Sequence, residues 1–182
     1  MADSGVTDDV AHLVEAARGG DRSAFGELYT RFSRMVHGIL LARGTRIDVD
    51  DLVQDVFVIA MQRIATLRAP EAFGGWLAAI ARNRAVDQLR RGSQIELALT
   101  DEVGGRMDPD RTEALAVLAV IQTLPEAYRE TLVLRLVEGM TGPEIAVRTG
   151  LTPASVRVNL HRGMKQLRER LGAVPATLQR HE

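Results

Sequence analysis

The chain has 182 residues, of which 46% are hydrophobic and 26% charged, and this suffices for one domain or two small ones. It has no cysteine, which excludes a disulfide framework and a thiolate metal site, and its four histidines are scattered, so we expect no metal and no cofactor. No apolar run approaches the roughly 18 residues that a membrane helix needs, and the acidic start is unlike a secretory signal. We therefore expect a cytoplasmic globular protein without membrane insertion.

The formal net charge of −1 conceals a separation of charge along the chain. Proteins that bind nucleic acids neutralise phosphates with Lys and Arg, so a near-neutral average would argue against such a function. Here, however, acidic residues crowd positions 48–55, whereas basic residues crowd positions 82–91 and 157–170. Acidic and basic surfaces of this kind indicate different partners.

Hydrophobic residues at three- and four-residue steps predict helices throughout the first half of the chain. The expected helices span residues 8–18, 23–43, 48–65 and 72–91. Gly44 would end the second helix, Asp48 can cap the third, and Pro70 interrupts the loop before the fourth. These four helices would form one bundle.

The helical pattern fails over residues 92–109, which contain two adjacent glycines and a proline, and we interpret this stretch as a flexible linker. Further helices are expected over 109–123, with Asp108 as its cap, and over 125–139. No strand alternation and no fixed repeat appears in the sequence. The predicted fold is therefore all-α, with two small helical domains joined by the linker.

The last third of the chain predicts a helix-turn-helix. Thr141 and Glu144 have the spacing of a capping box that starts a short helix, and Gly150 ends it. Ala146 is small where two helices must touch, and Val156 is expected to face inward from the second helix. That helix would expose residues able to contact bases or phosphates in a major groove: Arg157, Asn159, His161, Arg162 and Lys165. The alternative is an ordinary helical hairpin with a solvated basic face.

Motifs in both halves resemble the extracytoplasmic-function (ECF) sigma factors of the sigma-70 family. Those similar to region 2 are DDLVQDVF at 50–57, WL at 76–77, IARNRAVD at 80–87 and LRR at 89–91. Those similar to region 4 are LP at 124–125, EIA at 144–146, SVR at 155–157 and LHR at 160–162. They occur in the expected order. The resemblance implies an alternative sigma factor that binds core RNA polymerase and directs promoter-specific initiation of transcription, and not an enzyme.

The resemblance also implies a division of labour along the chain. It assigns residues 1–91 to sigma region 2, 92–109 to the linker, 110–172 to sigma region 4 and 173–182 to a short tail, after which we expect no further regulatory domain. Region 2 would bind the polymerase clamp and recognise and melt the minus-ten promoter element, and region 4 would bind the minus-thirty-five element. The implied partners are core RNA polymerase, through its clamp helices and flap, promoter DNA, and an anti-sigma factor that the linker would let lie between the domains.

Residue roles follow from the same resemblance. Docking on the clamp helices is expected of Asp51, Gln54 and Asp55, whose spacing places them on one helix face. Contact with minus-ten DNA is expected of Arg68, Asn83, Arg84, Arg90 and Arg91. Contact with minus-thirty-five DNA is expected of Ser155, Arg157, Val158, Asn159, His161, Arg162 and Lys165.

The loop over residues 66–71 corresponds to the part of the family that captures an unstacked base of the non-template strand. Trp76 could stack on a melted base, but Leu77 and Ile80 beside it at helical spacing favour a place in the core. Two departures from the family pattern predict lower phosphate affinity and a shifted upstream sequence. Asn159 stands where arginine is usual, and the pair at 163–164 is Gly-Met in place of Ala-Arg.

Two other classes of protein compete with this interpretation. A LuxR-like helix-turn-helix regulator that does not act as a sigma factor would share the C-terminal half, but a response regulator of that kind should show alternating strands and helices before it. A small helical hydrolase could use the aspartates together with His37, yet the sequence offers no nucleophile or metal constellation at a suitable spacing.

Overall fold

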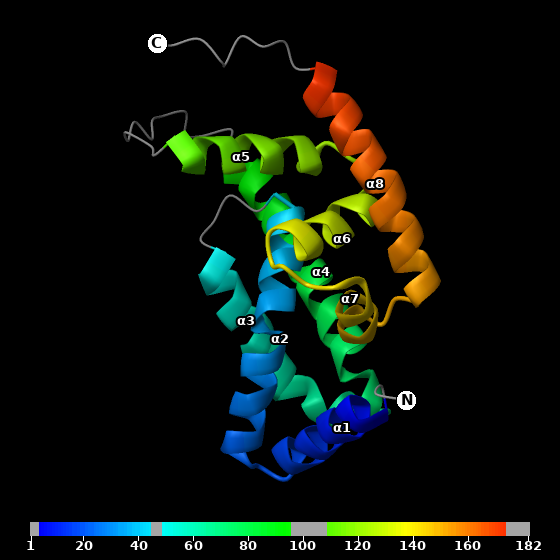
Figure 1. Ribbon diagram of the computed structural model, residues 1–182. Helices are drawn as coiled ribbons and strands as arrows, with labels where there is room; N and C mark the ends of the chain where they lie inside the picture. The colour runs from blue at the N-terminus through cyan, green and yellow to red at the C-terminus, as the bar shows by residue number, and fades with distance from the viewer. Residues whose placement is uncertain (1–3, 45–48, 96–108, 174–182) are drawn as a thin grey trace.

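The structure is a computed structural model that describes residues 4–44, 49–95 and 109–173. Its helices, shown in Figure 1, are α1 (Ser4–Arg18), α2 (Arg22–Ala42), α3 (Val49–Arg63), α4 (Phe73–Ile95), α5 (Pro109–Gln122), α6 (Glu126–Leu136), α7 (Gly142–Thr149) and α8 (Pro153–Ala173). Two short 3-10 turns, η1 (Ile64–Thr66) and η2 (Pro70–Ala72), join α3 to α4. The described residues form no strand, which confirms the all-α prediction.

Helix α2 is the centre of the first bundle and packs against α1, α3 and α4. Its buried side chains recur at three- and four-residue steps: Leu28, Phe32, Met35, Val36 and Ile39. The helix begins one residue before its predicted start, and Asp21 precedes it as its cap, with a carboxylate that accepts the backbone N–H of Ser23 at 2.8 Å and of Ala24 at 3.2 Å. The Ser23 hydroxyl also donates to this carboxylate, and that bond, followed by the two backbone bonds, lowers the pKa of Asp21.

The other predicted boundaries in this bundle shift by a few residues. Helix α1 begins at Ser4, four residues before the predicted start, and α3 ends at Arg63, where the chain tightens into η1. Helix α4 continues through Ile95, so four residues of the predicted linker are helical. Gly92 costs a helix about 1 kcal/mol but does not end one whose preceding turns are anchored on a bundle. The predicted caps Asp48 and Asp108 lie outside the described residues.

Helices α5 to α8 form the second bundle, with α6 and α8 packed most closely against each other. Its interior contains Ile121, Leu124, Leu132, Val133 and Leu167, and Ala42 of α2 belongs to the same cluster. Close packing of α6 on α8 depends on Gly163, because a Cβ there would lie 3.1 Å from the side chains of Tyr128 and Leu132.

The two bundles are not separate bodies, as Figure 1 shows by the position of α6 and α7 beside α2 and α4. Five buried residues of the second half belong to the same hydrophobic cluster as the interior of the first bundle: Leu134, Met140, Ile145, Ala146 and Val156. One continuous core therefore crosses the expected domain boundary. Among the described helices, none has both the length and the apolar character needed to cross a bilayer.

Candidate nucleic-acid and partner-binding surfaces

Local hydrogen bonds build the helix-turn-helix at its predicted place. The Glu144 carboxylate accepts the Thr141 backbone N–H at 2.8 Å, and the Thr141 hydroxyl accepts the Glu144 N–H at 3.4 Å, which completes the capping box. The Glu144 carboxylate also accepts the Thr141 hydroxyl at 2.8 Å, and the two bonds that it accepts, first from the Thr141 backbone and then from its hydroxyl, lower the pKa of Glu144. Gly150 ends α7 in the left-handed region at φ 73°. Thr152 then caps α8 by accepting the Ser155 N–H at 3.1 Å. The predicted helix-turn-helix is confirmed.

One face of α8 holds the motif together. Val156 is buried, as predicted, among Ile145, Ala146 and the first bundle. Gly163 contacts α6, and Met164 is half-buried against the hydrophobic interior of the second bundle. The Gly-Met pair, one of the two departures from the family pattern, therefore serves helix packing, and its predicted effect on phosphate affinity stays a prediction.

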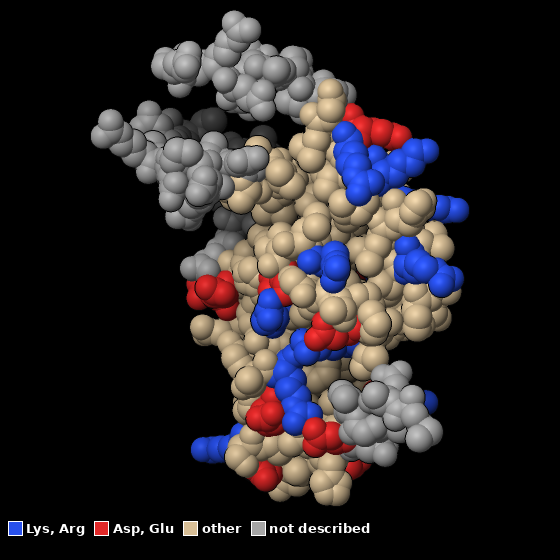
Figure 2. All heavy atoms as spheres, viewed as in Figure 1, with Lys and Arg blue, Asp and Glu red and all other residues tan. Residues whose placement is uncertain are grey.

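The opposite face of α8 presents the predicted DNA-contacting side chains. Figure 2 shows basic side chains along the edge of the molecule that α8 forms in Figure 1. The exposed residues are Ser155, Arg157, Val158, His161, Arg162 and Lys165, whereas Asn159 is half-buried. Lys165 lies 4.0 Å from Glu169, an exposed and weak pair. Arg157 and Arg162 form no ion pair with any residue that the structure describes.

The predicted minus-ten residues lie on α4 and on the loop before it. Asn83 and Arg90 are exposed on α4, Arg91 lies in the same helix, and Arg68 is exposed in the loop between η1 and η2. Arg84 is half-buried and donates to the Asp55 carboxylate at 2.6 Å. The structure thus brings together two residues to which the sequence assigned different partners.

The predicted polymerase-binding residues share the outer face of α3. Asp51, Gln54 and Asp55 are all exposed. The same face continues one turn further with Val58, 48% exposed, and Met61, 55% exposed. Sequence reasoning missed these two apolar residues, although helical spacing is the signal that identifies them: Val58 lies four residues after Gln54, and Met61 lies three residues after Val58.

A pocket of about 480 Å³ lies where the predicted base-capture loop meets the helix-turn-helix. Its lining comes from Leu67, Arg68, Glu71 and Trp76 on one side and from Val147 and Gly150 on the other. Trp76 is half-buried, packs with its ring centroid 5.8 Å from that of Phe73, and belongs to the rim of the first core. The prediction of a core role is confirmed for part of the indole, while another part lines the pocket.

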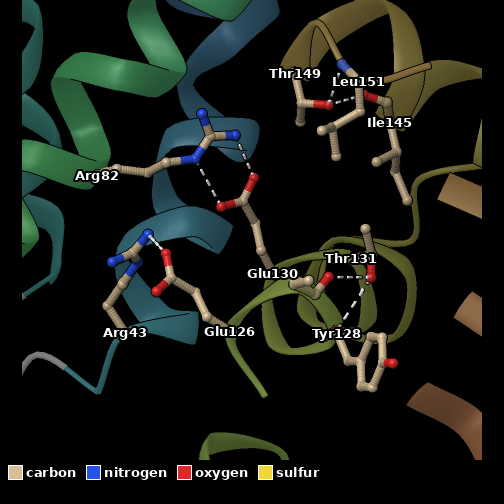
Figure 3. A network of polar contacts seen from close by, with 10 residues as sticks. Arg43, Arg82, Glu126, Tyr128, Glu130, Thr131, Ile145, Thr149 and Leu151 are labelled. Atoms are coloured by element: carbon tan, nitrogen blue, oxygen red, sulfur yellow. Dashed lines mark hydrogen bonds and ion pairs between the residues drawn. The ribbon is translucent and has the colours of Figure 1, made fainter. Parts of the chain in front are cut away.

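Polar contacts join the two bundles. The guanidinium of Arg82 on α4 donates two hydrogen bonds, of 2.9 and 2.6 Å, to the carboxylate of Glu130 on α6. Figure 3 shows this pair beside the contact between Arg43 and Glu126. The His37 ring nitrogen Nδ1 lies 2.6 Å from a Glu138 carboxylate oxygen. This bond to Glu138 raises the pKa of His37, although partial burial opposes it. Arg82 begins the basic run at positions 82–91 of the sequence, whereas Glu130 had no predicted role.

Known families and proteins match both halves of the chain. The family profile described as Sigma-70 region 2 matches residues 28–95, and the one described as Sigma-70, region 4 matches residues 114–167. RNA polymerase sigma factor CarQ of Myxococcus xanthus is 32% identical over 167 residues, which cover 87% of this chain and 95% of the relative. The ECF RNA polymerase sigma-E factor of Haemophilus influenzae is 30% identical over 176 residues, which cover 87% and 93%.

A solved structure is similar over nearly the same span. CnrH, in complex with the cytosolic domain of CnrY, superimposes with a TM-score of 0.65 at 28% identity and covers 91% of this chain and 99% of CnrH. Relatives at this level of identity and coverage, together with both regional profiles, establish the family. The chain belongs to the ECF group of the sigma-70 family of RNA polymerase sigma factors.

Proposed function

We propose that this chain is an alternative sigma factor that binds core RNA polymerase and directs promoter-specific initiation, and that it has no catalytic activity of its own. One observation carries the proposal: an exposed acidic face on α3 and an exposed basic face on α8 stand in the two segments that match sigma regions 2 and 4. The acidic surface is suited to a basic surface on a protein partner, and the basic surface is suited to the phosphates of a nucleic acid.

Polymerase binding is assigned to the outer face of α3. Asp51 and Gln54 offer carboxylate and amide groups for charge-assisted bonds with a basic partner, and Val58 and Met61 add apolar area beside them. Charged groups around an exposed apolar centre are typical of protein interfaces. The proposed partner of this face is the clamp helices of the polymerase, and the flap is the proposed partner of the second bundle.

Promoter reading is assigned to α8 and to α4. The N-terminal part of α8 exposes Arg157 and Arg162, whose guanidinium groups suit guanine edges and phosphates in the major groove of the minus-thirty-five element. In the minus-ten element, Asn83 would address a base, Arg90 and Arg91 would hold phosphates, and the pocket beside Arg68 would receive an unstacked base.

Regulation by an anti-sigma factor is part of the proposal. CnrH, the structural relative, is bound to the cytosolic domain of CnrY in its solved structure. This chain shares the arrangement of that relative over most of its length, and its membership of the ECF group supports a similar mode of control. We expect the protein to act in the cytoplasm, where core polymerase and promoter DNA are found.

The test is transcription in vitro with bacterial core polymerase on a library of genomic fragments, with the RNA starts sequenced. We expect starts that depend on the added chain and share two upstream motifs at a fixed spacing. If core polymerase neither binds the chain nor gains a start, while the chain alone binds DNA, a LuxR-like regulator becomes the better account. Activity in a parallel nuclease and phosphatase assay with divalent metals would contradict the absence of catalysis.

A further inference from the structure

Helix α1 lies outside the segment that matches the profile of sigma region 2, which begins at residue 28, and no site residue was predicted on it. It nevertheless packs against η1 and η2, the two turns in which the predicted base-capture loop begins and ends. Val10 and Val14 of α1 are buried in the same hydrophobic cluster as Ile64 and Leu67 at the start of the loop. Helix α1 therefore belongs to the core on which the loop is built.

Backbone hydrogen bonds fix the end of α1, where Arg18 is the last helical residue. The N–H of Gly20, at φ 93°, donates to the Ala17 carbonyl at 3.0 Å, and the N–H of Asp21 donates to the Ala16 carbonyl at 3.1 Å. A left-handed glycine with this pair of bonds is a common way to end a helix. Asp21 then caps α2, so Arg18 lies beside a turn whose geometry is fixed on both sides.

The Arg18 side chain reaches from this turn to the start of the loop. Its Nε–H donates to the backbone carbonyl of Ile64 at 3.2 Å, and the same oxygen accepts the Leu67 N–H at 3.2 Å. A carbonyl oxygen has two acceptor sites, so these two bonds satisfy it completely. The Arg18 guanidinium also donates to Glu15 at 2.6 Å, but the Glu15 side chain is 57% exposed, and an exposed pair of this kind contributes little.

The bond from Arg18 lies next to the pocket that the loop forms. Leu67 is buried, whereas the next residue, Arg68, is exposed and lines the pocket together with Trp76. Consecutive Cα atoms are held about 3.8 Å apart, so a displacement of Leu67 moves Arg68 with it. A pocket for an unstacked base must replace the stacking that the base has lost, and its walls must therefore keep their spacing.

We propose that Arg18 is a positioning residue, which holds the start of the base-capture loop through the Ile64 carbonyl and so keeps the pocket in the form that receives a base. The part played in base reading rests on the proposed function. The hold of α1 on the loop is a property of the free chain and can be measured without polymerase.

The first measurement is amide hydrogen exchange of the full chain, followed by NMR. The chosen substitution is Arg18→Met, because methionine keeps an aliphatic side chain of similar length but cannot donate a hydrogen bond. We expect the Leu67 amide to exchange roughly tenfold faster in this variant, because one charged hydrogen bond fewer opposes local opening of the loop. Arg18→Lys keeps a charged donor and should recover part of the protection.

Arg31→Met is the matched control for exchange. Arg31 forms ion pairs with Asp9 of α1 and with Glu27 of α2, so it also joins α1 to the bundle, but it does not contact the loop. This variant should keep the exchange rate of the Leu67 amide. Circular dichroism must show unchanged helix content in every variant that is compared.

The second measurement asks whether the loop still reads a base. Core polymerase with the chain transcribes a promoter found in the library experiment, with single abasic sites placed in turn along the non-template strand of the minus-ten motif. With the unaltered chain, the abasic site at the captured base should reduce starts roughly tenfold. With Arg18→Met, the same site should reduce them less than about threefold, because the displaced pocket gains less from the base. A smaller amount of active chain lowers all templates equally and leaves this ratio unchanged.

A folded Arg18→Met variant in which the Leu67 amide exchanges as in the unaltered chain would overturn the hold of α1 on the loop. So would an Arg18→Lys variant that recovers no protection. Faster exchange together with an unchanged effect of the abasic site would refute the role in base reading. Faster exchange in Arg18→Met, with no start from any version of the chain, would support the hold on the loop and refute the sigma function.

Discussion

The basic side chains of α8 and those of the first bundle differ in how many are available to a partner. On α8, Arg157 and Arg162 are exposed and have no acidic partner among the described residues. In the first bundle, Arg82 is bound to Glu130 and Arg84 to Asp55. Similar runs of arginine in the sequence therefore have different electrostatic roles, because a paired guanidinium no longer attracts phosphate as a free one does.

This difference indicates that the two regions proposed to bind DNA are not equally accessible to it in the free protein. Helix α8 can approach a major groove as it stands. The first bundle presents Asn83 and Arg90 at its surface, but two of its arginines are neutralised within the chain. We therefore expect the DNA affinity of the free protein to depend mainly on α8. The substitutions below test this difference between α8 and the first bundle.

The largest effect is expected from Arg162→Ala. Loss of one bidentate contact in the major groove should reduce transcription from dependent promoters roughly ten- to hundredfold. Run-off transcription with a fixed amount of core polymerase measures it. Arg22→Ala, which removes the same charge from an exposed position at the start of α2, is the matched control and should retain full activity. Equal losses in both variants would contradict a specific role for α8.

A smaller effect is expected from Asp51→Ala on α3. Removal of this exposed carboxylate should weaken binding of core polymerase about five- to tenfold. The expected loss is modest because a charge at the edge of an interface mainly increases the rate of association. Titration of labelled chain with core polymerase at low and moderate salt measures the change. Glu15→Ala on α1 is the control for charge. Unchanged affinity in Asp51→Ala would remove α3 from the proposed interface.

The pair of Arg84 and Asp55 should contribute little to stability. The Asp55 side chain is 52% exposed, so water screens the attraction even though Arg84 is mostly covered. A double-mutant cycle with Arg84→Ala and Asp55→Ala, followed by urea unfolding, should give a coupling free energy of at most about 1 kcal/mol. A much larger coupling would mean that the pair is structural, and that neither residue is available to polymerase or DNA.

The smallest effect is a dependence on pH through His37. Its bond to Glu138 raises its pKa, as do the charges of Glu138 and of Asp50 on α3, while Arg34 also faces the same carboxylate. A raised pKa means that the stabilising contribution is complete below the ordinary histidine pKa and is lost as pH rises through the raised value. The free energy of unfolding, measured with urea, should therefore fall modestly from about pH 6 to about pH 8.5. His37→Gln should abolish this change, and a free energy of unfolding that rises over the same range would refute the assignment.

Local features of the fold were predictable from sequence, because they depend on residues a few positions apart. The capping box of Thr141 and Glu144 and the terminal Gly150 lie where the spacing placed them. The start of α2 was predicted one residue late, at Ser23, and its cap Asp21 was not identified, because the hydrophobic periodicity that predicted the helix begins only at Phe25. The helical turn at the end of α4 was missed because Gly92 is only a weak breaker within an anchored helix.

The contact between the bundles was not predictable, because it joins residues that are remote in sequence. Glu138 meets His37 and Arg34 across about a hundred residues, and Arg82 meets Glu130 across the segment interpreted as a linker. Glu130 follows helical periodicity without any motif, so its burial depends on the other bundle. The roles of the α3 residues, and of Ser155 and Val158 on α8, came from the resemblance to the family, whereas the other α8 residues were first predicted from the exposed face of the helix-turn-helix. All of these roles stay predictions.

The most direct test of the account measures two binding reactions on the same two variants. The account predicts that Asp51→Ala loses affinity for core polymerase but, at saturating concentration, starts transcription at the same promoters. It predicts that Arg162→Ala keeps its affinity for core polymerase but loses those starts. If each substitution weakened both reactions equally, the separation of a polymerase-binding face on α3 from a DNA-binding face on α8 would be wrong.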